Sequence, residues 1–211
     1  MEKLNGTSHT VIGAATGFLT ANLLQTDPTG TILLVGIGAI SGLMPDIDID
    51  GKLSNKITIS HKIIRTAAQF IAILLILYSY FTGSGMNKWI GIGAGMLIFI
   101  ISSFITQRRM LTITGIGVLF GGFSLQENWL WLLGIYIIAA SFVPHRSYTH
   151  SLLGVFFFAY ISVQFEIAIG HEGVFITCLM GYVSHLIADM KILPFNKRGV
   201  KFFLPFSKKE F

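Results

Sequence analysis

The sequence predicts an all-α membrane protein, a polytopic transmembrane helical bundle of about 7–8 membrane-embedded helical segments, some of them short or re-entrant. Three observations predict this class. Of the 211 residues, 53% are hydrophobic and only 12% are charged, whereas a typical soluble domain is about 25% charged. The mean hydropathy is +0.71, and the chain holds 23 glycines, which let helices pack closely in membranes. A surface with so few charges needs lipid as its solvent, so the lipid bilayer is the first expected partner.

Eight apolar runs follow one another along the chain, and each is expected to form a helix. In order they are Thr10–Leu24, Thr31–Met44, Ile64–Phe81, Trp89–Ile105, Leu111–Phe123, Trp129–Val143, Leu152–Ile169 and Val174–Ala188. Several are shorter than the roughly 20 residues that cross a bilayer at full thickness. The stretch Leu111–Val143 therefore either crosses twice or forms a re-entrant hairpin. We expect one integral membrane domain over residues 1–211, with a short basic tail over about 190–211.

Alternation of these runs across the membrane sorts the loops into two sets. One side holds the N-terminus, Pro45–Ile63, Thr106–Met110, Pro144–Ser151 and the tail from Asp189. This side carries 14 of the 15 lysines and arginines, since Lys88 alone falls on the other side. Basic loops stay in the cytoplasm. We therefore expect a multi-pass protein of the inner (cytoplasmic) cell membrane with both termini in the cytoplasm, and no nucleic-acid partner, because this bias already accounts for the basic tail.

Ionisable residues gather at the ends of these runs, all on the predicted cytoplasmic side. They are His9, Asp46, Asp48, His145, His150, His185 and Asp189. His185 and Asp189 are four residues apart, which places both on one helix face, and Pro45 favours a helix break just before Asp46. A lone buried histidine is usually no more than hydrogen-bonded, but this set from four parts of the chain indicates a metal site. Imidazole together with carboxylate suits zinc, with manganese or iron as the alternatives.

These motifs resemble the YdjM-like family, a LexA-regulated group of membrane-bound predicted metal-dependent hydrolases. The matching stretches are His9 with Gly13, Leu43–Asp48, His145–Ser151 and Gly181–Asp189. They span nearly the whole chain, and the order of the motifs matches as well. The resemblance implies a metal-dependent hydrolase and leaves its substrate open.

The residues favour metal-assisted hydrolysis of a phosphoester or a lipid-type ester at the cytoplasmic membrane face, with a phospholipid or another phosphoester as the substrate. The expected metal ligands are His9, Asp46, His150, His185 and Asp189. Asp48 is expected to act as general base or to bind a second ion, and His145 to act as a ligand or a proton donor. Arg146 would clamp a phosphate, with Ser147 and Ser151 as hydrogen-bond donors to the substrate.

Two other classes of function stay open. Intramembrane histidines and aspartates also form ion pathways, so an ion or metal transporter is one alternative, although the polar groups gather at one face without a matching set opposite. A non-catalytic regulatory membrane protein with a structural metal is the other. The small-xxx-small pairs Gly13/Gly17 and Gly91/Gly95 predict close helix packing within the chain, and Cys178 is expected to be a buried packing thiol.

Overall fold

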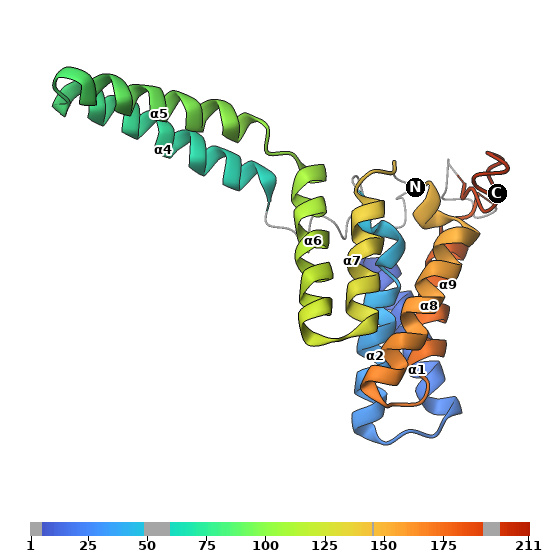
Figure 1. The fold of residues 1–211 in the computed structure, drawn as a ribbon. Helices are drawn as coiled ribbons and strands as arrows, with labels where there is room; N and C mark the ends of the chain where they lie inside the picture. The colour runs from blue at the N-terminus through green and yellow to red at the C-terminus, as the bar shows by residue number, and fades with distance from the viewer. Residues whose placement is uncertain (1–5, 49–59, 145, 192–198) are drawn as a thin grey trace. The chain divides into compact units, whose positions relative to one another are not determined.

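Every regular element in the residues that the computed structural model describes, 6–48, 60–144, 146–191 and 199–211, is helical (Figure 1). The elements are α1 (Gly6–Leu23), α2 (Pro28–Ser41), the 3₁₀ turn η1 (Met44–Ile47), α4 (His61–Thr82), α5 (Gly85–Ser103), α6 (Gln107–Leu125), α7 (Asn128–Ala140), the 3₁₀ turn η2 (Tyr148–His150), α8 (Leu152–Ile169) and α9 (Val174–Ala188). The predicted helical membrane class is confirmed, and each of the eight apolar runs overlaps one α-helix.

The chain divides into two compact units. The first combines residues 1–54 with 111–211, and the second is residues 55–110. The first unit is thus discontinuous in sequence, and the second is inserted between its two parts. The expectation of a single membrane domain stays a prediction.

The second unit is an antiparallel pair of long apolar helices, α4 and α5. Both are long and hydropathic enough to cross a membrane. The two helices approach each other at the glycines of α5, because a Cβ at Gly91 would overlap the side chain of Ser79, and one at Gly95 would crowd Ile76 and the backbone of Ala72. The predicted packing role of this glycine pair is confirmed as a contact within the chain.

In the first unit, α1 and α2 form a second glycine-mediated pair. A Cβ at Gly13 would overlap the carbonyl oxygen of Gly38, and a Cβ at Gly17 would overlap that of Leu34. The chain reverses between the two helices at Asp27, whose carboxylate accepts a hydrogen bond of 2.7 Å from the amide of Gly30 and so caps α2. Because the pair is antiparallel, the start of α1 lies beside the end of α2.

Helix α9 packs against α1, α2 and α8 and forms the centre of this unit. Its residues Tyr182 and Leu186 are buried, as is the thiol of Cys178, which confirms the expectation for the cysteine. Helix α8 is long and apolar enough to cross a membrane, whereas α2, α7 and α9 are shorter apolar helices. Helices α6 and α7 form an antiparallel hairpin in which a Cβ at Gly134 would overlap Leu119. The two predicted alternatives for this stretch, a double crossing and a re-entrant hairpin, stay predictions.

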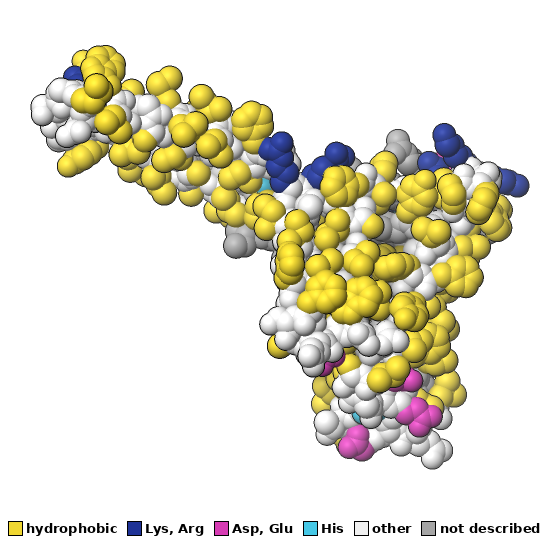
Figure 2. All heavy atoms as spheres, in the orientation of Figure 1, with side chains coloured by type: hydrophobic (Ala, Val, Ile, Leu, Met, Phe, Trp, Pro, Cys, Tyr) yellow, Lys and Arg dark blue, Asp and Glu magenta, His cyan; other side chains and the backbone are white. Residues whose placement is uncertain are grey.

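The outer surface of the helices is largely apolar (Figure 2). On the face that this view shows, basic side chains of the first unit lie at the end that carries its C-terminal segment, and acidic side chains are visible at the opposite end. Exposed hydrophobic residues such as Phe156, Ile167 and Leu23, 70% or more accessible, would carry a large solvation cost in water and a small one in lipid. This distribution is typical of a protein whose helices contact the bilayer.

Candidate metal centre

Six ionisable side chains from distant parts of the first unit meet at one end of it. His9 lies on the first turn of α1, Asp46 and Asp48 lie in and after η1, His150 ends η2, and His185 and Asp189 lie at the end of α9. Each is 5% exposed or less, and Asp48, His150 and His185 are completely buried. The convergence predicted for these residues is therefore present in the structure.

Small residues bring these elements together beneath the cluster. A Cβ at Gly42, just after α2, would overlap the carbonyl oxygen of His9, and a Cβ at Gly181 of α9 would crowd Ser41 and the Gly38 carbonyl. Helix α2 ends at Ser41, and Pro45 occupies the start of the 3₁₀ turn that follows, which confirms the predicted break. The chain can therefore turn and direct the side chain of Asp46 into the cluster.

The innermost atoms are two imidazole nitrogens and two carboxylate oxygens. Nε2 of His150 and Nε2 of His185 are 3.3 Å apart. The Oδ1 atom of Asp46 lies 3.8 Å from the first nitrogen and 3.7 Å from the second, and Oδ2 of Asp189 lies 3.7 Å from both. Two ligands bound at about 2.0–2.1 Å to a tetrahedral zinc stand roughly 3.3 Å apart, so these atoms are close to the spacing that a shared ion requires.

The tautomer of His185 follows from its other nitrogen. Nδ1 lies 2.7 Å from the carbonyl oxygen of Gly42, and a carbonyl oxygen can only accept a hydrogen bond. Nδ1 therefore carries the proton and donates it to Gly42, which leaves Nε2 with a lone pair directed at the cluster. Metal-bound histidines almost always have this kind of second contact, which fixes the ring and its tautomer.

His150 is held through a hydroxyl group. Thr149 Oγ1 donates a hydrogen bond of 3.0 Å to Oδ2 of Asp48, and it lies 3.1 Å from Nδ1 of His150. Since the hydroxyl proton is directed at the carboxylate, its oxygen accepts from Nδ1–H, and Nε2 of His150 again presents a lone pair. Asp48 itself lies on the Nδ1 side of His150, 3.9 Å from that nitrogen, and so orients the ring.

Charge also favours a cation at this point. Three buried carboxylates, those of Asp46, Asp48 and Asp189, meet one guanidinium, that of Arg146, in the described part of the site. Buried carboxylates are stabilised by nearby cations, so this concentration of acidic groups favours a bound divalent cation. The donor set therefore fits a divalent metal, and two groups are close enough to hold an ion: His9, His185 and Asp189, and Asp46, His150 and His185.

His9 extends the cluster on one side. Its Nε2 atom lies 3.6 Å from Oδ1 of Asp189, the carboxylate oxygen that does not face the other two histidines. Its ring stacks on that of His185, with centroids 3.9 Å apart and planes at 24°. His9 is thus placed either to bind the ion from this side or to orient Asp189.

The other predicted site residues that the structure describes lie in the loop and turn before α8. Arg146 adopts a left-handed conformation with φ 59° and forms an ion pair with Asp189, Nη2 to Oδ2, of 2.8 Å. Ser147 donates its hydroxyl to the carbonyl oxygen of Pro144. Ser151 donates to the carbonyl oxygen of Tyr148 at 2.7 Å and caps α8. The phosphate clamp of Arg146 and the substrate contacts of both serines stay predictions, and His145 lies outside the described residues.

Sequence patterns missed the residues behind the cluster. Thr149 bridges Asp48 and His150, and Tyr182 donates its hydroxyl to the carbonyl oxygen of Thr149. Tyr136 of α7 lies 2.9 Å, oxygen to oxygen, from Tyr182. A signal existed for two of them, because Thr149 is adjacent to His150 and Tyr182 precedes His185 by three residues on α9. Tyr136, from a different helix, had none.

The chain was also compared with known proteins. No curated protein and no solved structure matches it. A family model described as YdjM inner membrane protein matches residues 4–211, nearly the whole chain. All the buried histidines and aspartates described above lie within the matched residues. This protein therefore belongs to the YdjM inner membrane protein family.

Proposed function

We propose that this protein is a metal-dependent hydrolase that cleaves a phosphoester, or a related lipid-type ester, at the cytoplasmic face of the inner membrane. One observation carries the proposal. Nε2 of His150 and Nε2 of His185 face each other at 3.3 Å, with carboxylate oxygens of two aspartates beside them. Imidazole nitrogens and carboxylate oxygens are the ligand types that zinc and related divalent cations bind, and Asp46, His150 and His185 lie close enough together to hold one ion.

His150, His185, Asp46 and Asp189 would hold the metal, with His9 as a further ligand or as a support for Asp189. Zinc is the first candidate, because two imidazoles with carboxylates are a common zinc set, and manganese or iron are the alternatives. The bound ion would supply Lewis-acid activation of a water molecule and of the substrate oxygen.

Residues around the cluster would bind the substrate and move protons. Arg146, held by Asp189 at 2.8 Å, would turn part of its guanidinium to the substrate phosphate, since it carries five N–H donors. Asp48 would hold His150 through Thr149, and its use as a general base remains part of the proposal. In the net reaction the water oxygen joins phosphorus, the P–O bond to the alcohol breaks, and the alcohol leaves with a proton.

The position of the cluster supports a membrane-proximal substrate. In the predicted topology the cluster-bearing helix ends all lie on the side that holds 14 of the 15 lysines and arginines. Basic residues at a membrane surface attract anionic lipid headgroups. A phosphoester in such a headgroup would therefore be concentrated at the level of the cluster.

The experiment combines metal analysis with a substrate panel. Protein in lipid nanodiscs is measured for metal content and then offered an aryl phosphate monoester, an aryl phosphate diester and phospholipids. We expect bound zinc, hydrolysis that a chelator abolishes and zinc restores, and loss of the metal in a His150→Ala plus His185→Ala variant. The matched control is His171→Ala, in the loop between α8 and α9, which should keep the metal.

Three results would contradict parts of the proposal. Unchanged metal content in the double variant would refute the metal site. A second result would favour a regulatory protein with a structural metal. In it, the metal-loaded protein hydrolyses no substrate in the panel, and a folded Asp46→Ala variant still complements the phenotype of a deletion strain. Metal-ion flux in proteoliposomes without ester turnover would favour a transporter.

A further inference from the structure

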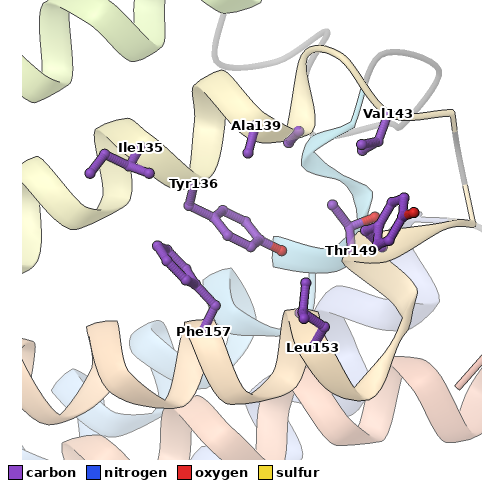
Figure 3. A pocket seen from close by; sticks show the side chains of 10 residues that line it. Ile135, Tyr136, Ala139, Val143, Thr149, Leu153 and Phe157 are labelled. Carbon is purple, nitrogen blue, oxygen red and sulfur yellow. The ribbon is translucent and has the colours of Figure 1, made fainter. Parts of the chain in front are cut away.

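A cavity of about 120 Å³ lies in the first unit between α7 and α8 (Figure 3). Its wall includes Tyr136 and Ala139 from α7, Leu153 and Phe157 from α8, and Thr149 from η2. The wall is apolar, and the proposed hydrolysis uses no part of it except Thr149. In Figure 3 the rings of Tyr136 and Phe157 lie side by side, with centroids 5.9 Å apart, and Leu153 and Thr149 lie beyond the tip of the Tyr136 side chain.

Thr149 connects this cavity with the metal cluster. The residue lines the cavity, and its hydroxyl group bridges Asp48 and Nδ1 of His150 at 3.0 and 3.1 Å. The polar atoms behind the wall are already occupied with one another, because Tyr136 hydrogen-bonds Tyr182, which donates to the Thr149 carbonyl. One residue therefore separates an apolar space from a proposed metal ligand.

The chemistry of the wall decides what can occupy the cavity. An apolar wall gains free energy from contact with hydrocarbon and offers no partner to a polar group, so this open space of about 120 Å³ suits a short stretch of hydrocarbon. The cavity also borders the lipid-facing surface, since Ile135 and Leu153 in its wall are 37% and 56% exposed. In a membrane the hydrocarbon that reaches such a surface is the acyl chain of a lipid.

We propose that the cavity between α7 and α8 holds part of the acyl chain of a phospholipid and so places its phosphoester at the His/Asp cluster. This inference rests on the proposed hydrolase function and narrows its substrate to a phosphoester lipid with a hydrocarbon chain. A chain bound beside Thr149 enters from the bilayer, and its headgroup stays at the polar end of the unit. Chain binding in the cavity then selects lipids over water-soluble phosphoesters.

The test fills the cavity without changing the cluster. Ala139 lines the cavity and its side chain is exposed, so Ala139→Phe puts a ring into the space. The matched control is Ala168→Phe, an exposed alanine near the far end of α8 that lies outside the cavity wall. Ala139→Leu is a smaller filling variant for the case in which the phenylalanine variant fails to fold.

Binding is measured with a phosphatidic acid that carries a diazirine in its acyl chain, in nanodiscs, with the adducts mapped by mass spectrometry. We expect adducts on the wall residues of α7 and α8 in the wild type, at least fivefold fewer in Ala139→Phe, and no change in Ala168→Phe. Equal labelling of the wall in both variants would overturn the proposal. An unlabelled wall in the wild type, with an oligomeric state that Ala139→Phe alters, would assign the cavity to a second copy of the chain and also overturn it.

Kinetics separate this inference from the proposed function. Ala139→Phe should lower kcat/KM for a long-chain phosphoester about tenfold and leave that for a short-chain ester with the same headgroup unchanged. If Ala139→Phe and Ala168→Phe hydrolyse the esters with the same chain-length preference, the chain site is refuted and the proposed hydrolase function is retained. Wall labelling that Ala139→Phe removes, without metal-dependent hydrolysis of either ester, would support the chain site and refute the hydrolase.

Discussion

Replacing Thr149 by valine tests the structure behind the metal ligands. Valine keeps the shape of threonine closely and replaces only the hydroxyl group by a methyl group; this hydroxyl contacts Asp48 at 3.0 Å and Nδ1 of His150 at 3.1 Å. Asp48 is completely buried, so its carboxylate loses a donor that water does not replace. A hydrogen bond to a charged group contributes about 1.5–3 kcal/mol, and the folding stability of the metal-free protein should fall by that amount.

Thr149→Val should also weaken metal binding, and this effect is measured separately from the loss of folding stability. Nδ1 of His150 loses the partner that fixes its tautomer, and changes to such partners of metal-bound histidines typically cost 10–100-fold in metal affinity. We therefore expect Thr149→Val to raise the Kd for zinc by about 10–100-fold. The measurement is zinc competition against a chelator of known affinity, with thermal unfolding of the metal-free protein alongside.

Thr149→Ser is the matched control, because it restores the hydroxyl group and should recover most of the zinc affinity. A folded Thr149→Val protein with a Kd within twofold of the wild type would refute the reasoning. It would mean that His150 is either no ligand or is held in place without the threonine.

Three further predictions follow from the helix contacts and the charge distribution. Gly38→Ala should destabilise the protein by about 1–3 kcal/mol, measured by unfolding in detergent, because the new Cβ would overlap the backbone of Gly13; unchanged stability would show that the helices can separate at no cost. Thr177→Val should be neutral or stabilising, since Oγ1 of this buried threonine has no hydrogen-bond partner among the described residues, and a loss above 1 kcal/mol would indicate an overlooked partner. In a cysteine-free background, a membrane-impermeant maleimide should label Lys208→Cys only in inverted vesicles and Ser124→Cys only in spheroplasts; the reverse pattern would invert the topology.

The residues of the cluster could be predicted from the sequence because the patterns that indicate them are short-range spacings or simple counts of charge. His185 and Asp189 share a helix face by their spacing alone, and both do face the cluster, with Nε2 and Oδ2 3.7 Å apart. Pro45 marked the end of α2, and the lysine and arginine count put the same helix ends on one side. These rules need no knowledge of how helices pack in three dimensions.

The division of roles within the cluster could not be predicted, because it depends on turns. Asp46 and Asp48 look equivalent in sequence, but Asp46 has φ −81° and ψ 15° within η1, and Asp48 is extended. One carboxylate therefore faces the paired nitrogens and the other lies behind His150. Arg146, in a left-handed conformation that few residue types favour, reaches Asp189, which no spacing rule indicates.

The discontinuous first unit has a consequence for the biosynthesis of the protein. Asp46 leaves the ribosome before the inserted hairpin of α4 and α5, and His185 follows 139 residues later (185 − 46). At about 5–20 residues per second, that interval is roughly 7–30 s. During it, α1 and α2 can already pair through their glycines in the membrane, but their carboxylates have no histidine partners from α9. The cluster is complete only after the last helix has been inserted, so an ion that it holds would enter at the end of synthesis rather than guide the early steps.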